Sequence, residues 1–271
     1  MTMAKIHPLA TVHPGAILAD SVEIGPYAYI DDAVELGPGT KILPHATIFP
    51  YVKMGRDCTV FPGAVVGAIP QDLKFEGEFS SVEIADRVVI RECATVNRGT
   101  AASGKGVTRI GSDSLLMSYV HVAHDCNIGS HCILVSYVGL AGETDVEDWA
   151  IIGGGTKVHQ FSKIGTHAMV GGSTGVNKDI PPYSICGRVP ICFAGINMVG
   201  LRRRGFDSDT IRTIKDIYDV IYYQGYNISD SLARIEEGFA ESEVRDNILR
   251  FIRDSRRGIV RAGDPREKGV D

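Results

Sequence analysis

Residues 110–129 read IGSDSLLMSYVHVAHDCNIG, and an aliphatic side chain returns in this stretch at every sixth position. These positions are Ile110, Leu116, Val122 and Ile128, and the same frame continues to Val176. An α-helix does not have this period, because its buried face recurs every three to four residues. A period of six instead gives one short strand and one corner per repeat, which predicts a parallel β-helix.

The N-terminal part of the chain has the same period. Aliphatic residues or Met occupy every sixth position from Ile6 to Val66, and the frame resumes at Ile84 before it shifts by two residues. Two positions before each of these residues the side chain is small or β-branched, which lets the chain turn closely above a filled interior. We therefore predict a β-helical domain over residues 1–189.

The repeat resembles that of the hexapeptide-repeat proteins over about residues 4–180. The resemblance implies a left-handed helix of triangular section with three hexads in each coil, so that residues eighteen apart lie above one another. Two segments break the frame, residues 68–80 and 97–107. We predict that both are loops pushed out from corners, where binding residues are commonly found on a rigid scaffold.

Residues 190–271 are predicted to form a helical C-terminal domain, because their apolar residues recur at helical spacing. The first predicted helix follows a start signal at residues 207–209, the second follows Ser229, and the third ends near Gly258. Their apolar positions are Ile211, Ile214, Tyr218 and Ile221, then Leu232, Ile235 and Phe239, then Val244, Ile248, Phe251 and Ile252.

Composition narrows the possible partners and compartment. The formal net charge of -5 argues against bulk nucleic-acid binding. No apolar run could serve as a signal peptide or membrane span, so we expect a cytoplasmic protein without stable membrane insertion. The six cysteines lack CxxC spacing and are interpreted as small buried thiols, not as disulfides or zinc ligands.

The histidines of the opening stretch allow three interpretations. Stepping by eighteen from His124 gives Gly142 and then Gln160, which predicts a column on one outer wall. The side chains could simply be solvated polar groups. Alternatively, His124 is a general base that Asp125 orients, and the Gly142 N–H stabilises an oxyanion, which together indicate acyl transfer. In the third interpretation His121 and His124, with His159 or His167, bind zinc.

The motifs HVAHDC, QDLKF, VNRGT, LAG, VHQF, GRVP and GLRRRGF resemble, in this combination, those of the UDP-N-acetylglucosamine O-acyltransferases. The resemblance runs nearly end to end. It implies transfer of a 3-hydroxyacyl group from acyl carrier protein to the 3-hydroxyl of UDP-N-acetylglucosamine, the first step of lipid A synthesis. It also implies a homotrimer with active sites in the clefts between subunits, and no cofactor or metal, since the acyl group is carried on the phosphopantetheine of the carrier.

The same resemblance assigns roles to individual residues. It makes His124 the general base, Asp125 its orienting acid and Gly142 the oxyanion donor. Gly172 leaves room in the acyl groove, which predicts a chain of about fourteen carbons or more, each buried methylene adding ~0.8 kcal/mol. The remaining substrate-binding candidates are Gln71, Asp72, Lys74, His121, His159, Gln160, Asn197, Arg203 and Arg204.

The chain departs from the family pattern at three positions, because Asn97 and Glu143 stand where histidine is common and Val199 where an acidic residue is common. These changes affect substrate contacts and leave the proposed proton transfer in place. Three other functions are weighed. A related N-acyltransferase would carry a separate uridine-binding domain before the coil. A hexapeptide acetyltransferase would use coenzyme A, and a non-catalytic scaffold would have no use for the His124 column.

Overall fold

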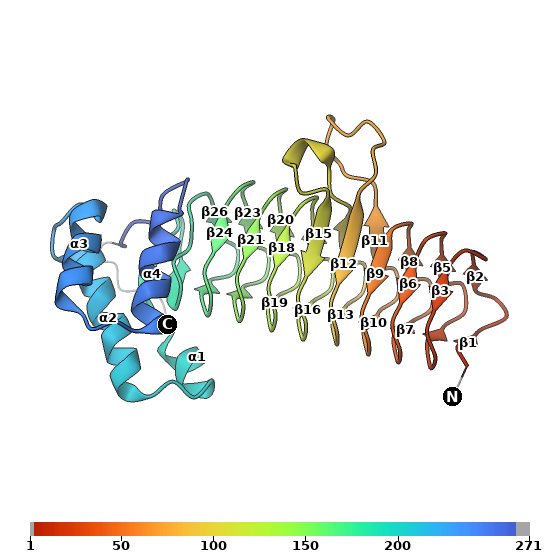
Figure 1. Cartoon of the computed structure of the whole chain (residues 1–271), viewed down its shortest axis with the longest axis horizontal. Helices are drawn as coiled ribbons and strands as arrows, with labels where there is room; N and C mark the ends of the chain where they lie inside the picture. The colour runs from red at the N-terminus through yellow and green to blue at the C-terminus, as the bar shows by residue number, and fades with distance from the viewer. Residues whose placement is uncertain (1–2, 264–271) are drawn as a thin grey trace.

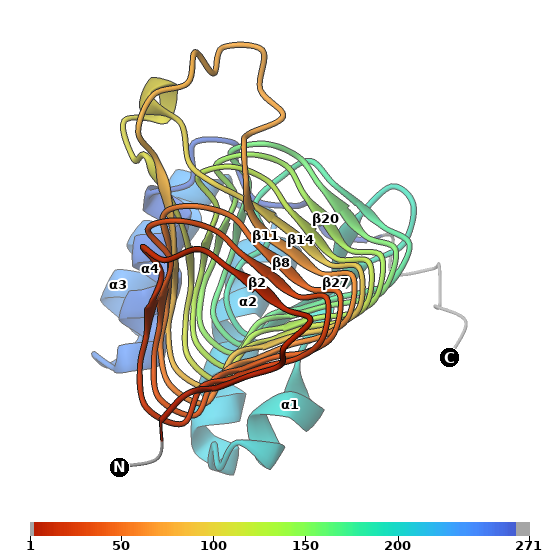
Figure 2. The same ribbon diagram turned by 90° about the vertical axis from the view of Figure 1, so that its right-hand side faces the viewer.

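In the computed structural model, which describes residues 3–263, the chain forms an elongated parallel β-helix with helices at its C-terminal end (Figure 1). Seen along its axis, the coil has a triangular section (Figure 2). Both features agree with the prediction from the hexad frame. The structure therefore supplies three flat faces and three long edges on which side chains can be arranged.

Each face of the triangle is one sheet. Sheet A contains β1 (Lys5–Ile6), β4 (Glu23–Ile24), β7 (Lys41–Ile42), β10 (Thr59–Val60), β13 (Val89–Ile90), β16 (Leu115–Leu116), β19 (Ile133–Leu134), β22 (Ile151–Ile152), β25 (Met169–Val170), β27 (Ser184–Gly187) and β28 (Cys192–Ile196). Sheet B contains β2 (Thr11–Val12), β5 (Tyr29–Ile30), β8 (Thr47–Ile48), β11 (Val65–Ala68), β14 (Thr95–Asn97), β17 (His121–Val122), β20 (Gly139–Leu140), β23 (Lys157–Val158) and β26 (Gly175–Val176). Sheet C contains β3 (Ile17–Leu18), β6 (Glu35–Leu36), β9 (Val52–Met54), β12 (Ser81–Ile84), β15 (Val107–Ile110), β18 (Asn127–Ile128), β21 (Asp145–Val146) and β24 (Lys163–Ile164).

The strand register confirms the spacing of eighteen residues between coils. In sheet B, Val122 pairs with Leu140 and Leu140 with Val158, all in parallel. These aliphatic residues point inward and are fully buried or nearly so. Burial of each such side chain contributes about 1.5–3 kcal/mol, so the repeated aliphatic position accounts for the stability of the stack.

The corners of the coil contain residues with left-handed backbone. At each edge one residue takes a left-handed backbone conformation, and on the edge between sheets B and C these residues include Asp125 (φ 60°), Glu143 (φ 58°) and Phe161 (φ 66°). Left-handed backbone is costly for residues other than glycine, so the surrounding ladder must hold it. The three edges are called the A–B, B–C and C–A edges after the sheets that meet there.

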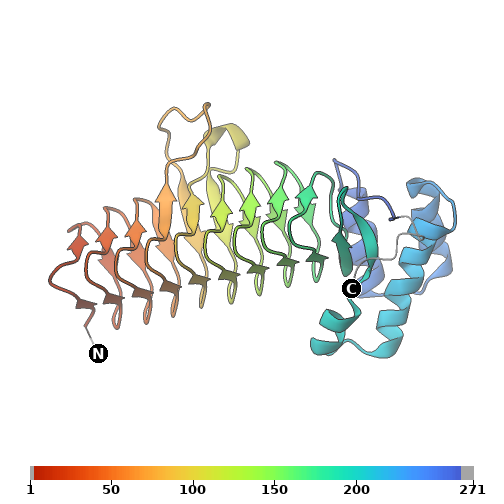
Figure 3. The ribbon, with the colours of Figure 1, turned by 180° about the vertical axis from the view of Figure 1, so that it is seen from behind.

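Both interruptions of the frame are loops, as predicted, and both leave the coil at the B–C edge (Figures 2 and 3). The first loop lies between β11 and β12, and the second lies between β14 and β15 and contains a short 3-10 helix at Ala101–Ser103. The next corner of the same edge, between β17 and β18, carries His124. The two loops therefore stand directly beside the histidine.

The C-terminal part contains α1 (Met198–Arg203), α2 (Ser208–Tyr223), α3 (Ile228–Gly238) and α4 (Glu243–Arg253). The predicted start of α3 was wrong, because Asn227 caps this helix by accepting a hydrogen bond from the Asp230 N–H. The predicted end of α4 near Gly258 was also wrong. The chain leaves the helix earlier, since Ile259 forms a bridge with Asp179 on the coil.

Two elements between the coil and the long helices were not predicted. β28 pairs antiparallel with β27, so residues after the predicted boundary at residue 189 extend sheet A. Helix α1 follows, and Asn197 caps it by accepting a hydrogen bond from the Gly200 N–H. The Arg202–Arg204 cluster lies at the C-terminal end of this helix.

The two ends of the stack differ. At the N-terminal end the inward side chain of Ile6 is 47% exposed, whereas that of Ile24, its partner in the next coil, is 3% exposed. At the other end, the helices lie against the last coil (Figure 1), and the Tyr218 hydroxyl from α2 donates a short hydrogen bond to the Pro182 carbonyl. No helix among residues 3–263 has the length and apolar character needed to span a bilayer.

The cysteines follow the prediction only in part. Cys58, Cys126, Cys132 and Cys186 are buried, and burial raises the pKa of the Cys126 thiol to about 12. Cys93 is exposed, which corrects the expectation that all six are buried. Its backbone is left-handed (φ 57°), so it occupies the outward position of a corner and not the small inward position.

Candidate active site at the B–C edge

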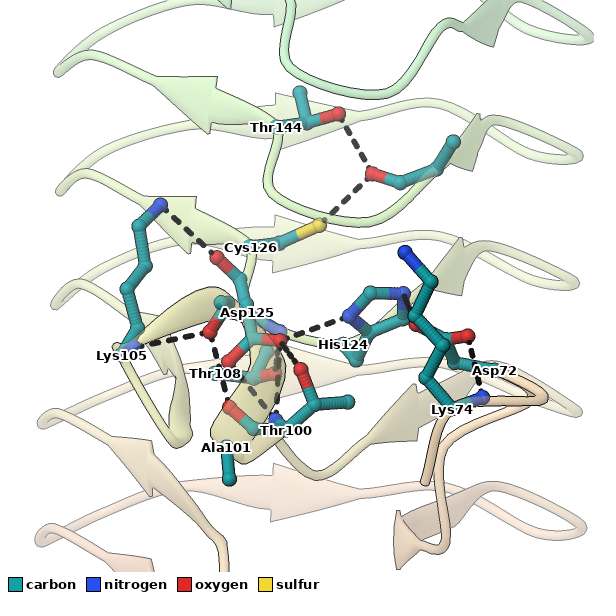
Figure 4. A network of polar contacts seen from close by, with 12 residues as sticks. Asp72, Lys74, Thr100, Ala101, Lys105, Thr108, His124, Asp125, Cys126 and Thr144 are labelled. Carbon is teal, nitrogen blue, oxygen red and sulfur yellow. Dashed lines mark hydrogen bonds and ion pairs between the residues drawn. The ribbon is translucent and has the colours of Figure 1, made fainter. Parts of the chain in front are cut away.

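His124 and Asp125 form a buried pair at the corner between β17 and β18. The Nδ1 atom of His124 lies 2.8 Å from Oδ2 of Asp125. The His124 residue is 8% exposed and Asp125 is fully buried, so little water competes for this contact. Figure 4 shows the imidazole lying between Asp125 on one side and Asp72 on the other.

The second loop holds the Asp125 carboxylate. The Thr100 N–H donates to both carboxylate oxygens at 3.0 Å, and the Thr100 hydroxyl donates to Oδ2 at 2.8 Å. Gly99 precedes it, and a Cβ atom there would lie 2.6 Å from Oδ1 of Asp125 and still closer to the backbone of Gly106 and Val107. The glycine of the VNRGT stretch is therefore needed for this close approach.

The first loop brings Asp72 to the open nitrogen of His124. Its Oδ2 atom lies 3.7 Å from Nε2 of the ring, and its Oδ1 atom accepts a hydrogen bond from the Lys74 N–H at 3.0 Å. Figure 4 shows the Lys74 side chain on the same side of the ring as Asp72. Gln71 is exposed in the same loop. The structure thus brings the QDLK stretch to the predicted base.

The electrostatics favour an ionised Asp125 and a more basic histidine. The hydrogen bond with Asp125 raises the pKa of His124, burial opposes this, and the negative charges of Asp125, Asp72 and Glu143 add to the rise. For Asp125, burial works to raise the pKa, but the hydrogen bonds from His124 and Thr100 outweigh it and the net pKa is lowered. The carboxylate is therefore suited to orient the imidazole in its N–H form at Nδ1.

Gly142 lies directly over the imidazole, one coil further along. A Cβ atom at this position would come within 2.4 Å of Cε1 and Nε2 of His124, so any side chain there would displace the imidazole. Within residues 3–263 the Gly142 N–H has no protein acceptor. This corner position lies outside the sheet ladder, which explains why proline can occupy it in other coils, for example at Pro26 and Pro44. The geometry leaves one N–H donor beside Nε2.

Three further candidates, Gln160, His159 and His121, lie at or next to this edge and differ in their surroundings. Gln160 occupies the column position one coil beyond Gly142, as the pairing of Leu140 with Val158 requires. His159 is exposed, and its Nδ1 lies 2.9 Å from the Gln160 carbonyl. His121 lies in β17, where its Nδ1 is 2.7 Å from the Thr95 hydroxyl and burial lowers its pKa.

Asn197, Arg203 and Arg204 lie elsewhere, at the end of the coil beside α1. The Nδ2 atom of Asn197 donates to the His167 carbonyl, and Nη1 of Arg204 lies 3.2 Å from Nδ1 of His167. His167 belongs to the C–A edge, where its ring stacks on that of Trp149. Arg203 is exposed. Within one chain these residues do not share an edge with His124, as the separation of α1 from the loops in Figure 2 shows.

Gly172 lies on the third edge. It forms the corner between β25 of sheet A and β26 of sheet B, and a Cβ atom there would lie 3.0 Å from the Gly154 carbonyl oxygen of the preceding coil. The predicted site residues of a single chain therefore fall on all three edges. One chain brings together the base, its acid, the N–H donor and the first loop, but not the predicted acyl groove or the arginines.

Metal binding has no ligand set in the part of the chain that the structure describes. No group of three or more His, Cys, Asp or Glu side chains in residues 3–263 could hold an ion. His167, one of the ligands considered, is engaged with Arg204 on another edge, and its pKa is lowered to about 4 by burial and by that arginine. The structure therefore gives no support to the zinc interpretation.

Sequence comparison identifies relatives along nearly the whole chain. Residues 179–260 match the family model described as UDP N-acetylglucosamine O-acyltransferase, domain 2, and residues 108–142 match the bacterial transferase hexapeptide model. The acyl-[acyl-carrier-protein]–UDP-N-acetylglucosamine O-acyltransferase of Chlorobaculum parvum is 53% identical over 250 residues, covering 92% of this chain and 94% of that protein. The enzyme of the same name from Thiobacillus denitrificans is 43% identical, with 96% and 100% covered.

Solved structures give the same result. The UDP-N-acetylglucosamine acyltransferase of Bacteroides fragilis matches with a TM-score of 0.93 and 48% identity, covering 94% of this chain and all of that one. The Francisella novicida enzyme matches with a TM-score of 0.92 and 40% identity, with 98% and 96% covered. The coil is accordingly a left-handed parallel β-helix. The chain belongs to the family of acyl-[acyl-carrier-protein]–UDP-N-acetylglucosamine O-acyltransferases.

Proposed function

We propose that the B–C edge is the catalytic centre for transfer of a 3-hydroxyacyl group from acyl carrier protein to the 3-hydroxyl of UDP-N-acetylglucosamine, the first step of lipid A biosynthesis. The observation that carries this assignment is the alignment of His124, its buried partner Asp125 and the N–H of Gly142 around one open ring nitrogen. An acyl transfer needs a base and an oxyanion donor beside the same reacting group.

In the proposed reaction the neutral His124 acts through Nε2. This atom takes the proton from the sugar 3-hydroxyl as the hydroxyl oxygen attacks the thioester carbonyl. When the tetrahedral intermediate collapses, the carbon–sulfur bond breaks, and the thiolate of the phosphopantetheine receives the proton from the imidazolium. Asp125 holds Nδ1–H throughout and stabilises the transient positive charge, since its carboxylate lies 2.8 Å away and is fully buried.

The Gly142 N–H stabilises the negative charge that develops on the carbonyl oxygen. Its proton has no protein acceptor within residues 3–263, so no existing hydrogen bond has to break first. The second polar side of the pocket is formed by Asp72, which can accept a hydrogen bond from a sugar hydroxyl while that sugar lies next to Nε2. Lys74 supplies a positive charge beside it. Gln71, His121, His159 and Gln160 are assigned to the walls of the same pocket.

We also propose that the working enzyme is a cytoplasmic homotrimer. The support for the trimer is the separation of the predicted site residues. Gly172 and the Arg203–Arg204 pair lie on different edges from His124. If three coils pack side by side, the A–B or C–A edge of one chain can face the B–C edge of its neighbour. The acyl groove at Gly172 and the phosphate contacts of Asn197, Arg203 and Arg204 then come from an adjacent subunit.

The pH dependence follows from the environment of His124. The base must be neutral, so kcat/KM should decrease as the pH falls through the pKa of His124 in the free enzyme. Asp125 raises this pKa, so we expect the midpoint of the acid limb above 6.5, the ordinary value for histidine. In the Asp125→Asn variant the anionic partner is lost and the midpoint should move lower. A wild-type midpoint at or below 6.5 would contradict this assignment.

The donor is tested by comparing acyl groups of different length and carrier. With UDP-N-acetylglucosamine as acceptor, turnover should require the donor on acyl carrier protein, and coenzyme A thioesters should be poor substrates. Because Gly172 has no side chain to block the groove, 3-hydroxyacyl donors of about fourteen carbons should be preferred over donors of about ten, and Gly172→Met should reverse this preference. Preference of the unmodified enzyme for the short chain, or for coenzyme A, would count against the proposal.

A further inference from the structure

Thr100 makes more hydrogen bonds to the Asp125 carboxylate than His124 does. It is almost completely buried, and its N–H and hydroxyl together make three hydrogen bonds to the carboxylate. The hydroxyl donates to Oδ2 at 2.8 Å, and His124 Nδ1 contacts the same oxygen at the same distance. One carboxylate oxygen is thus shared between the base and the second loop (Figure 4).

The second loop is in turn held by the first. The next residue after Thr100, Ala101, donates its N–H to Oε1 of Glu78 at 2.8 Å. The Oε2 atom of Glu78 accepts from the Glu76 N–H, which fixes the carboxylate within its own loop. That loop also carries Asp72, 3.7 Å from Nε2 of His124. Contacts therefore run from one side of the imidazole, through both loops, to its other side.

We propose that Thr100 is a positioning residue for His124, which fixes the Asp125 carboxylate and shares the charge of Oδ2 so that the base is oriented yet stays neutral at working pH. Glu78 couples this arrangement to the loop that carries Asp72. The inference rests on the proposed function, because it takes His124 as the base. It assigns to the VNRGT stretch a role in proton transfer that does not involve contact with substrate.

The charges around the ring explain why such a device is needed. The Lys74 side chain lies on the Asp72 side of the ring and is a cation there (Figure 4). The acidic groups that face His124 are Asp125 from its own corner, Asp72 from the first loop and Glu143 from the next coil. Each favours the imidazolium. Lys105 lies on the outer side, where its Nζ is 3.3 Å from the Asp125 carbonyl. The donors on the Asp125 carboxylate therefore decide how strongly the ring holds its proton, because each stabilises the carboxylate charge without help from the imidazolium.

The test is a pair of variants at position 100. Thr100→Val removes the hydroxyl and keeps the shape, whereas Thr100→Ser keeps the hydroxyl. In Thr100→Val the pKa of His124, measured by NMR titration and assigned by comparison with His124→Ala, should rise by about half a unit to one unit. At a pH below this pKa the neutral fraction falls about 3- to 10-fold, and kcat/KM should fall with it and recover at higher pH. The KM for the nucleotide sugar should stay the same, and Thr100→Ser should behave like the wild type.

The matched control is Thr40→Val, because Thr40 is also fully buried and its hydroxyl donates to a protein oxygen, the Gly55 carbonyl, far from the site. It should leave the pH profile unchanged. If Thr100 had only a structural role, Thr100→Val would lower activity equally at every pH, without a shift in the His124 titration. That result, or a downward shift, would overturn the inference while the wild-type acyl transfer still stood.

Glu78→Ala gives a second and independent test, which does not depend on the folding of the position-100 variants. It removes the acceptor of the Ala101 N–H, so it should move the His124 titration in the same direction by a smaller amount. Combined with Thr100→Val, the two changes should be less than additive, since both act through one chain of contacts. An additive double variant would refute the coupling between the loops. Absence of acyl transfer in the wild type would instead reject the proposed function, and the NMR titration would still report on Thr100.

Discussion

Replacement of His124 by alanine should lower turnover by roughly 10²- to 10⁴-fold, the usual contribution of a positioned general base. The ring makes no ladder hydrogen bond, and its backbone position needs no special conformation. The fold should therefore survive, and the variant should sediment like the wild type. Steady-state assays at saturating acceptor and donor would measure the loss, which should appear in kcat.

The control for this experiment is His13→Ala. His13 lies on the same B–C edge in the first coil, where it is exposed and outside the proposed site. This variant should keep wild-type turnover. If His124→Ala retained more than a tenth of the activity, another group would have to take the proton, and the general-base assignment would be abandoned.

The second large effect is expected at Gly142. In Gly142→Ala the new methyl carbon would lie about where the imidazole is now, 2.4 Å from two of its ring atoms. The ring must move, and the methyl group also narrows the space beside the N–H donor. The N–H is retained in this variant, but a methyl group that keeps the carbonyl oxygen away from it has the effect of losing the donor. Losing an oxyanion donor costs about 10²- to 10³-fold in kcat, so we expect a loss of about that size. Gly142 has no left-handed backbone, so alanine introduces no local strain and stability should change little.

Gly238→Ala is the matched control, because a Cβ at that position meets nothing within 4 Å and its backbone is likewise not left-handed. Both variants should unfold at similar temperatures, and only Gly142→Ala should lose activity. Nearly full activity in Gly142→Ala would show that the imidazole can shift without penalty. In that case the donor of the oxyanion hydrogen bond has to be sought at another corner.

The coil was predictable because one short-range rule repeats along it. An inward aliphatic residue every sixth position specifies both strand and core, and insertions are visible as breaks in that rule. The rule ends near residue 180, and the elements after it were harder to predict. β28 depends on pairing with β27, and α1 is too short to show a periodic pattern. Caps such as Asn227 depend on local hydrogen bonds that several neighbouring residues could make equally well.

The site was predictable to the same extent as the register. Spacing of eighteen placed His124, Gly142 and Gln160 in one column, and the strand pairing has them so. The spacing could not predict the contact of Asp72 with His124 or that of Thr100 with Asp125. Both depend on loop conformation, which is set by hydrogen bonds between segments far apart in sequence. Gly99 could have indicated Thr100. It lies at the start of the second loop, where only a residue without a side chain lets the backbone approach Asp125 closely.

The partly exposed first coil affects where the molecule should begin to unfold. A solenoid loses its turns one after another from whichever terminus is least protected, since each turn rests only on its neighbours. Ile6 lies at the less protected end of the described residues, whereas the helices cover the opposite end. Local unfolding at the N-terminal end should therefore leave the proposed active site intact, because several coils separate that end from the corner that carries His124.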